Sequence, residues 1–118
     1  MTGSTGYHSG LAAEDCVARD YALRNHQIAA RRWRGKAGEI DLITRDGDTV
    51  VFVEVKKSRD FARAALRLGR RQMDSICASA GEFLAGEPKG QLTDVRFDLA
   101  MVNATGAIRV IENAFMED

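Results

Sequence analysis

The sequence predicts a single α/β domain in which helices flank a mixed central sheet. Its length of 118 residues suits one compact domain. Segments with helical spacing of apolar residues and segments rich in β-branched residues follow in the order helix, three strands, helix, two strands. We expect residues 1–9 to form a flexible N-terminal tail and residues 10–118 to form the domain.

The first helix is expected from residue 10 to about residue 25. Its apolar stripe, spaced at a helical period, consists of Leu11, Ala18, Tyr21 and Ala22. Glu14 falls within this stripe, where an unpaired buried charge would be costly. Glu14 therefore either lies at the edge of the helix or faces a partner on the sheet.

Three strands are expected next, at residues 27–34, 39–44 and 49–56. Residues 35–38 fit a turn, and Asp46-Gly47 is a strong signal for a tight hairpin. The third strand is so rich in β-branched residues that we expect it to lie buried at the centre of the sheet.

The second half of the chain supplies one more long helix and two strands. Residues 57–69 fit either a mobile loop or a short helix, and residues 70–84 fit a helix. The inner side of that helix is expected to carry Met73, Ile76, Ala80 and Leu84. Residues 96–102 and 108–111 complete the sheet.

The hairpin brings charged residues together if Arg45 pairs with Asp48. In that register Asp41 faces Phe52, and Asp41 and Glu54 become diagonal neighbours roughly 7–8 Å apart at the backbone. Strand alternation also puts Glu39 and Lys56 on their face of the sheet.

Carboxylates placed this close repel each other unless a cation lies between them. Mg²⁺ or Mn²⁺ prefers such oxygen ligands, so Asp41, Glu54 and Glu39 are candidate metal ligands. Lys56 can position a water or stabilise charge on a phosphate, and Glu14 would add a carboxylate from the helix. The alternative is a solvated sheet face on which Glu54 and Lys56 form a weak ion pair.

Basic residues gather on both sides of the acidic strands. The candidates for binding nucleic acid are Arg31, Arg32, Arg34, Lys57, Arg59 and Arg71. Such clustering is expected where phosphates approach a site, although runs of arginine also occur on ordinary solubilising surface.

Composition gives no preference for a charged partner, because the formal net charge is zero. Cys16 and Cys77 lack metal-type spacing and fit reduced thiols. Membrane-span and signal-peptide patterns are not found, so we expect a cytoplasmic protein without a membrane partner. A homodimer is an open alternative.

Two central motifs also resemble a known family. GEIDLI at residues 38–43 and VFVEVK at residues 51–56 are similar to the signature of the bacterial YraN family, which is assigned to the PD-(D/E)XK nuclease superfamily. The resemblance extends to residues 10–14, 96–98 and 111–115. It implies a restriction-endonuclease-like α-β-β-β-α-β core.

Carried over by position, the resemblance makes Asp41 and Glu54 metal-binding acids, Lys56 the catalytic lysine and Glu14 the acid of the first helix. Two departures are Lys57-Ser58-Arg59, where the family commonly has Thr-Arg after the lysine, and Arg71-Gln72 in place of Lys-Gln. The implied function is Mg²⁺- or Mn²⁺-dependent cleavage of DNA, including branched or repair intermediates. A non-catalytic nucleic-acid-binding or assembly module on the same fold is the alternative.

Overall fold

The computed structural model describes residues 2–115, and from residue 10 onward it describes their side chains. The elements, in chain order, are α1 (Thr2–Leu23), β1 (Gln27–Arg34), β2 (Glu39–Asp46), β3 (Thr49–Lys57), α2 (Phe61–Leu66), α3 (Arg70–Leu84), the 3-10 turn η1 (Gly90–Leu92), β4 (Val95–Val102) and β5 (Ile108–Ile111). Within these residues the strands form one sheet in the order β1-β2-β3-β4-β5. Only the β3–β4 pair in this sheet is parallel, so the sheet is mixed.

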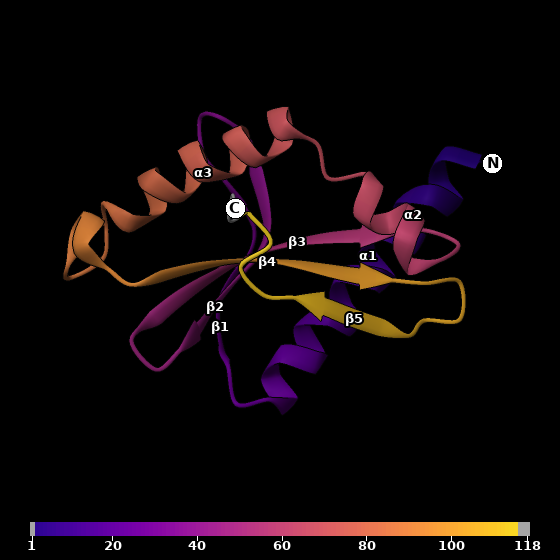
Figure 1. Cartoon of the computed structure of the whole chain (residues 1–118), viewed down its shortest axis with the longest axis horizontal. Helices are drawn as coiled ribbons and strands as arrows, with labels where there is room; N and C mark the ends of the chain where they lie inside the picture. The colour runs from indigo at the N-terminus through magenta and orange to yellow at the C-terminus, as the bar shows by residue number, and fades with distance from the viewer. Residues whose placement is uncertain (1, 116–118) are drawn as a thin grey trace.

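The predicted fold class and order of elements are confirmed (Figure 1). The helix expected at residues 70–84 and the strand expected at 108–111 have those bounds. Residues 57–69, for which a loop and a helix were both open, contain the short helix α2. The first helix begins at Thr2, eight residues before the expected start. None of the helices among residues 2–115 is long and apolar enough to cross a lipid bilayer.

The sheet is covered on both faces, by α1 on one and α3 on the other. The residues of α1 that pack on the sheet are Ala13, Val17, Ala18 and Tyr21. The predicted stripe is therefore partly wrong, because Ala22 is exposed. Steps of four residues from Ala13 reach Val17 and Tyr21, so the face of α1 that contacts the sheet lies beside the predicted one. On the other face, Ile76, Ala80 and Leu84 of α3 are buried as expected, and Met73 is half-buried.

The predicted register of the β2–β3 hairpin is wrong by two residues. Asp46 pairs with Thr49, and Leu42 pairs with Val53, so Gly47 and Asp48 form the loop. Gly47 has φ +60°, and the first loop position is where type II′ turns carry glycine. A shift of two residues leaves each side chain of a regular strand on the same face. If the observed register is continued one pair beyond Leu42 and Val53, Asp41 lies opposite Glu54 instead of opposite Phe52.

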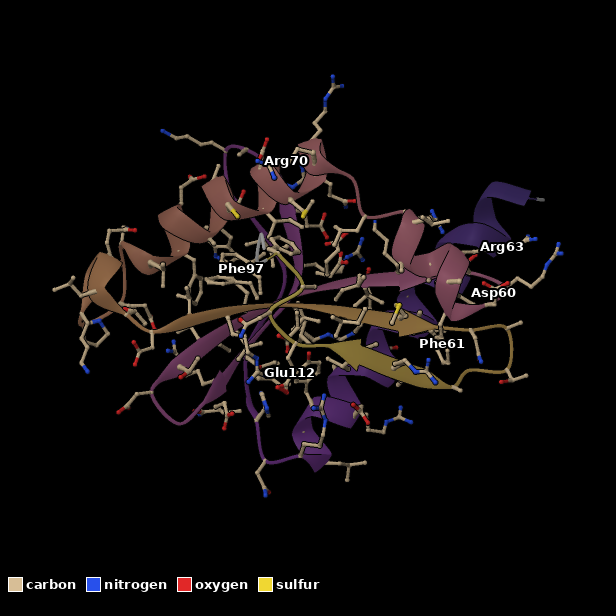
Figure 2. All side chains as sticks on the ribbon, in the orientation of Figure 1. Asp60, Phe61, Arg63, Arg70, Phe97 and Glu112 are labelled. Carbon is tan, nitrogen blue, oxygen red and sulfur yellow. The ribbon has the colours of Figure 1, made fainter. Side chains whose placement is uncertain are left out.

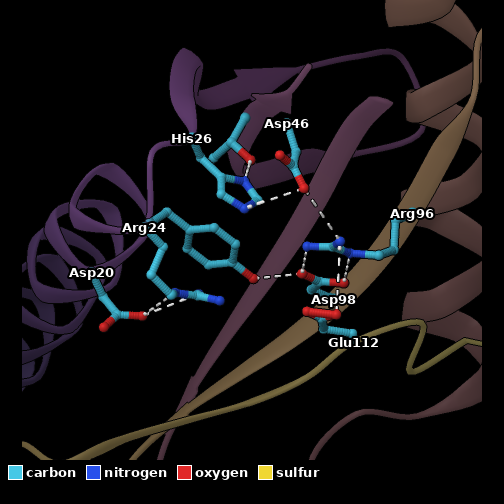
Figure 3. A network of polar contacts seen from close by, with 9 residues as sticks. Asp20, Arg24, His26, Asp46, Arg96, Asp98 and Glu112 are labelled. Atoms are coloured by element: carbon cyan, nitrogen blue, oxygen red, sulfur yellow. Dashed lines mark hydrogen bonds and ion pairs between the residues drawn. The ribbon is translucent and has the colours of Figure 1, made fainter. Parts of the chain in front are cut away.

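A buried polar network fixes α1 to the sheet (Figure 3). The Tyr21 hydroxyl donates to Asp98 Oδ2 at 2.7 Å, and Arg96 donates to both oxygens of Asp98 at 2.9 and 3.0 Å. Asp98 is fully buried, and Arg96 also lies 3.9 Å from Asp46 and 3.8 Å from Glu112. Burial raises the pKa of Tyr21, so its hydroxyl remains a donor. The network connects α1 to β4 and to the hairpin end of β2.

The turn between β1 and β2 is held against α3. Two serine hydroxyls of α3 donate to turn carbonyls, and a turn N–H donates to a glutamate of α3. These hydrogen bonds are Ser75 Oγ to Ala37 O at 2.6 Å, Ser79 Oγ to Gly38 O at 2.9 Å, and Lys36 N to Glu82 Oε2 at 2.7 Å. Because β2 begins directly after this turn, the contact also fixes where Asp41 lies relative to α3.

Gly35 allows this close approach. A Cβ at Gly35 would lie 2.6 Å from Glu82 Oε2 and 2.9 Å from Ser79 Oγ, whereas a Cβ at Gly81 of α3 would meet nothing within 4 Å. We expect Gly35→Ala to destabilise the protein by about 1–3 kcal/mol through overpacking. Gly81→Ala, the matched control, should stabilise it by up to about 1 kcal/mol. Urea unfolding of both variants checks this, and equal effects would contradict the turn's tight packing.

Candidate metal centre

Asp41 and Glu54 lie where β2 and β3 separate. Pairing between the strands ends at Leu42 opposite Val53, and Asp41 and Glu54 are the next positions in that register. The Asp41 carboxylate accepts a hydrogen bond from the Val55 N–H at 2.8 Å. Asp41 therefore satisfies a backbone donor of β3 at the point where the sheet ladder stops.

The alternation of β2 also breaks at Asp41. Ile40 and Ile43, three residues apart, both pack in the core beneath α3, whereas Leu42 packs in the core beneath α1. A regular strand would place Ile40 and Leu42 on the same face. Irregular strands re-aim side chains and occur frequently beside active sites, which is consistent with a functional role for Asp41.

Glu54 is held by residues from its own strand and from α3. Its side chain is 4% exposed, and the Lys56 ammonium lies 3.1 Å from Glu54 Oε2. Gln72 Nε2, from the first turns of α3, donates a hydrogen bond to the same oxygen. Gln72 was not among the predicted site residues; its only signal in the sequence was the Arg71-Gln72 pair at the start of a helix.

Burial of the two carboxylates opposes their ionisation. It is the largest influence on Glu54 and, together with the nearby Asp41, raises the pKa of Glu54 to about 8, despite the opposing effect of Lys56. Burial likewise raises the pKa of Asp41, although the hydrogen bond from Val55 opposes the shift. The pair therefore retains a proton readily, and a cation between the carboxylates would take the place of that proton.

Glu14 faces the same region from α1. Burial and the neighbouring Asp41 raise the pKa of Glu14. Its Oε1 atom is buried and has no hydrogen-bond partner among the residues that the structure describes. Glu14 and Lys56 line an open pocket of about 340 Å³, together with residues of α1, β3 and α2. Of the two placements left open for Glu14, the charged neighbours Asp41 and Arg32 favour the side of the sheet, and its role in the site stays a prediction.

The donor set fits a hard divalent cation. Asp41 and Glu54 offer carboxylate oxygens, and Glu14 adds a buried oxygen without a hydrogen bond. Among the side chains of residues 10–115, no group of three or more His, Cys, Asp or Glu is placed so that it could hold a metal ion by itself. Mg²⁺ commonly binds through one or two carboxylates and completes its shell with waters and substrate phosphates.

Glu39 is placed differently from the other predicted ligands. Its carboxylate oxygens lie 3.1 Å from Arg32 Nε and 3.3 Å from Arg34 Nη2. It is close enough to Asp41 to raise the pKa of that residue, but two arginines already compensate its charge. A ligand role for Glu39 stays a prediction.

The candidate nucleic-acid-binding residues fall into two groups. Those on β1 pair with acidic residues: Arg31 with Asp15, Arg34 with Glu39, and Arg32 with both Glu14 and Glu39. Those at the end of β3 and after it lie at the pocket or on exposed surface: Lys57, Arg59 and Arg71.

The sequence prediction did not assign Arg67 to the site. Arg67 lines the pocket and donates a hydrogen bond to the Lys57 carbonyl at 2.7 Å. On the outer side of α2, Arg63 lies next to Asp60, and Arg70 stands at the start of α3 (Figure 2).

Over residues 13–102 the sequence matches the family described as "Uncharacterised protein family UPF0102". The chain belongs to the UPF0102 family. A UPF0102 protein of Cereibacter sphaeroides strain KD131 is 59% identical over 115 residues, which cover 98% of both chains. A UPF0102 protein of Ruegeria pomeroyi is 59% identical over 113 residues, which cover 96% of this chain and 92% of the relative. UPF0102 is the YraN family, so the resemblance noted in the central motifs is confirmed.

The carboxylate pair gives this UPF0102 protein a defined dependence of stability on pH. The pKa of Glu54 is higher in the folded state than its ordinary value, so its contribution is fully present below about pH 4.5 and is lost as pH rises through about 8. In the presence of a chelator, wild type should lose on the order of 2 kcal/mol of stability between pH 5 and pH 9. Glu54→Gln should lose much less.

Urea unfolding across this pH range measures the effect. Asp48→Asn is the matched control, because Asp48 is exposed in the hairpin loop. If Glu54→Gln and Asp48→Asn both followed the wild-type pH profile, the raised pKa of the Glu54 carboxyl through burial beside Asp41 would be contradicted.

Proposed function

We propose that this protein is a Mg²⁺- or Mn²⁺-dependent phosphodiesterase that cleaves DNA in the cytoplasm. The observation that carries the proposal is the carboxylate pair of half-buried Asp41 and buried Glu54, with the Lys56 ammonium 3.1 Å from Glu54. Such a pair is unfavourable without a positive charge between its members. The arrangement is therefore costly for the fold and useful for binding a cation.

Asp41 and Glu54 would hold the ion through carboxylate oxygens. When bound, a divalent ion polarises a phosphate and makes a coordinated water more acidic. Gln72 fixes the orientation of Glu54 through its hydrogen bond to Oε2. Lys56, with a side chain 14% exposed at the pocket, is placed to stabilise negative charge that develops on a phosphate.

The polynucleotide backbone would approach from the side of α2. Lys56, Lys57 and Arg67 supply positive charge at the pocket, and Arg59 and Arg71 would add exposed positive charge from the loop after β3 and from α3. Contacts of this kind bind phosphates without reading sequence, so they suit a nuclease that recognises DNA structure. We therefore propose branched or repair intermediates as the substrates.

A cleavage assay with Mg²⁺ or Mn²⁺ tests the proposal on labelled linear, flapped and four-way DNA. Lys56→Ala should reduce cleavage by at least about a hundredfold, because the lysine acts mainly on charge in the transition state. Its affinity for DNA should change much less, since other basic residues supply most phosphate contacts. Lys89→Ala, an exposed lysine away from the pocket, should cleave like wild type.

Two controls make the assay decisive. Lys56 compensates Glu54, so the melting temperature of each variant must show that it is folded at the assay temperature. All proteins are purified identically, because a contaminating nuclease would give equal activity in every sample. Equal cleavage by wild type and Lys56→Ala would reject this site. No cleavage of any substrate would favour the non-catalytic nucleic-acid-binding or assembly module.

A further inference from the structure

Arg32 occupies an unusual position in β1. Its neighbours Arg31 and Trp33 pair with Leu42 and Ile40 of β2, so Arg32 lies opposite Asp41. Its φ angle is +53°, in the left-handed region that a residue with a long side chain rarely adopts within a strand. Both strands are thus irregular at the Arg32–Asp41 position. Backbone strain of this kind persists only where surrounding contacts compensate it.

The contacts that accompany this conformation are acidic. Arg32 Nε lies 3.1 Å from Glu39 Oε1 and 3.8 Å from Glu14 Oε1. The distance to Glu39 fits a charge-assisted hydrogen bond, whereas the distance to Glu14 fits only an ion pair. Glu14 Oε1 is the buried atom without a hydrogen bond in the described part of the chain, so Arg32 compensates its charge without satisfying the atom.

A positive charge at this point is needed on electrostatic grounds. Glu14, Glu39 and Asp41 come from α1 and from neighbouring positions of β2, and they disfavour one another's ionised forms. Lys56 lies against Glu54, on the other strand of the carboxylate pair. Arg32 therefore supplies the compensation on the β1 and α1 side of the site.

We propose that Arg32 is an internal counter-ion that gives way when a divalent cation binds, and that its released guanidinium then binds a phosphate of the DNA. This inference rests on the proposed function for the cation and the substrate. A cation at Asp41 that also draws in Glu14 supplies the charge that Arg32 supplies in the metal-free protein. Guanidinium groups bind phosphate oxygens in a two-pronged manner, which suits the released side chain to that role.

The proposal links metal binding to DNA binding. Arg32 competes with the cation for the carboxylates, so it weakens metal binding in the absence of DNA. Once a phosphate holds Arg32, that competition disappears. The cation and DNA should therefore strengthen each other's binding by the same factor, as linkage requires.

Arg31 offers a matched control for Arg32. The two residues are adjacent on β1, carry the same charge and have almost equal side-chain exposure, 42% and 41%. Arg31 pairs with Asp15, outside the carboxylate site. Its positive charge lowers the pKa of Glu14 less than the charge of Arg32 does. Arg31→Gln therefore reports the loss of one nearby positive charge, and Arg32→Gln reports that loss together with the loss of the counter-ion.

Calorimetric titration of Mn²⁺ without DNA is the first measurement. Arg32→Gln should bind Mn²⁺ about fivefold more tightly than wild type, the fold-change expected from removing one competing ion pair. Arg31→Gln should bind nearly as wild type does, and Arg32→Lys should lie closer to wild type than to Arg32→Gln. Equal Mn²⁺ affinities for Arg32→Gln and Arg31→Gln would overturn the proposal.

Fluorescence anisotropy of a labelled DNA duplex, with and without Ca²⁺ as a non-cleaving cation, is the second measurement. Wild type and Arg31→Gln should bind DNA more tightly when Ca²⁺ is present, and Arg32→Gln should lose most of that gain. An undiminished gain in Arg32→Gln would overturn the phosphate contact.

Failure of wild type to bind Mn²⁺ would contradict the proposed function, and the counter-ion role would then be judged on metal-free protein. In that case Arg32→Gln should melt at a lower temperature than Arg31→Gln at pH 8. A melting temperature no lower than that of Arg31→Gln would overturn the role of Arg32 as well.

Discussion

Two carboxylates, Asp41 and Glu54, lie opposite each other where β2 and β3 separate, and the pairing of these strands holds them there. The two-residue loop at Gly47 and Asp48 sets this register. At the other end of β2, the turn that connects β1 to β2 is fixed by its hydrogen bonds to α3. Neither carboxylate can move away without breaking contacts elsewhere in the sheet. In the metal-free fold their repulsion is therefore relieved by a proton kept on the pair, and a bound cation would take the place of that proton.

The groups around the pair compensate this repulsion in different ways. Lys56 provides positive charge and Gln72 a hydrogen bond at Glu54, while Val55 donates to Asp41. Arg32 adds charge from β1 at the expense of an unfavourable backbone conformation. The stability of the fold comes mainly from the cores beneath α1 and α3 and from the network around Asp98, not from the carboxylate site. Because other parts of the protein stabilise the fold, the site can keep an unfavourable arrangement.

Most of the fold follows from local patterns in the sequence. The β-branched run of β3 indicated a buried central strand, and the spacing of Ile76, Ala80 and Leu84 placed α3 correctly. The face of Glu54 in β3 was also predictable, because alternation survives an error of two residues in register, whereas the break in the alternation of β2 at Asp41 was not. The register itself was not, since Asp46-Gly47 and Gly47-Asp48 are both acceptable loops. The contacts of Gln72 with Glu54 and of Arg32 with Glu14 depend on packing between separate elements, and their only local signal was the Arg71-Gln72 pair at the start of a helix.

The central claim is that Asp41 and Glu54 bind one divalent cation between them. A crystal structure of the protein soaked in Mn²⁺, with anomalous difference density measured for wild type and Glu54→Gln, tests it most directly. Wild type should show one strong anomalous peak within coordination distance of carboxylate oxygens from both Asp41 and Glu54, and the peak should be lost or greatly weakened in Glu54→Gln. Strong density bound elsewhere, with none between these two residues, would contradict the account.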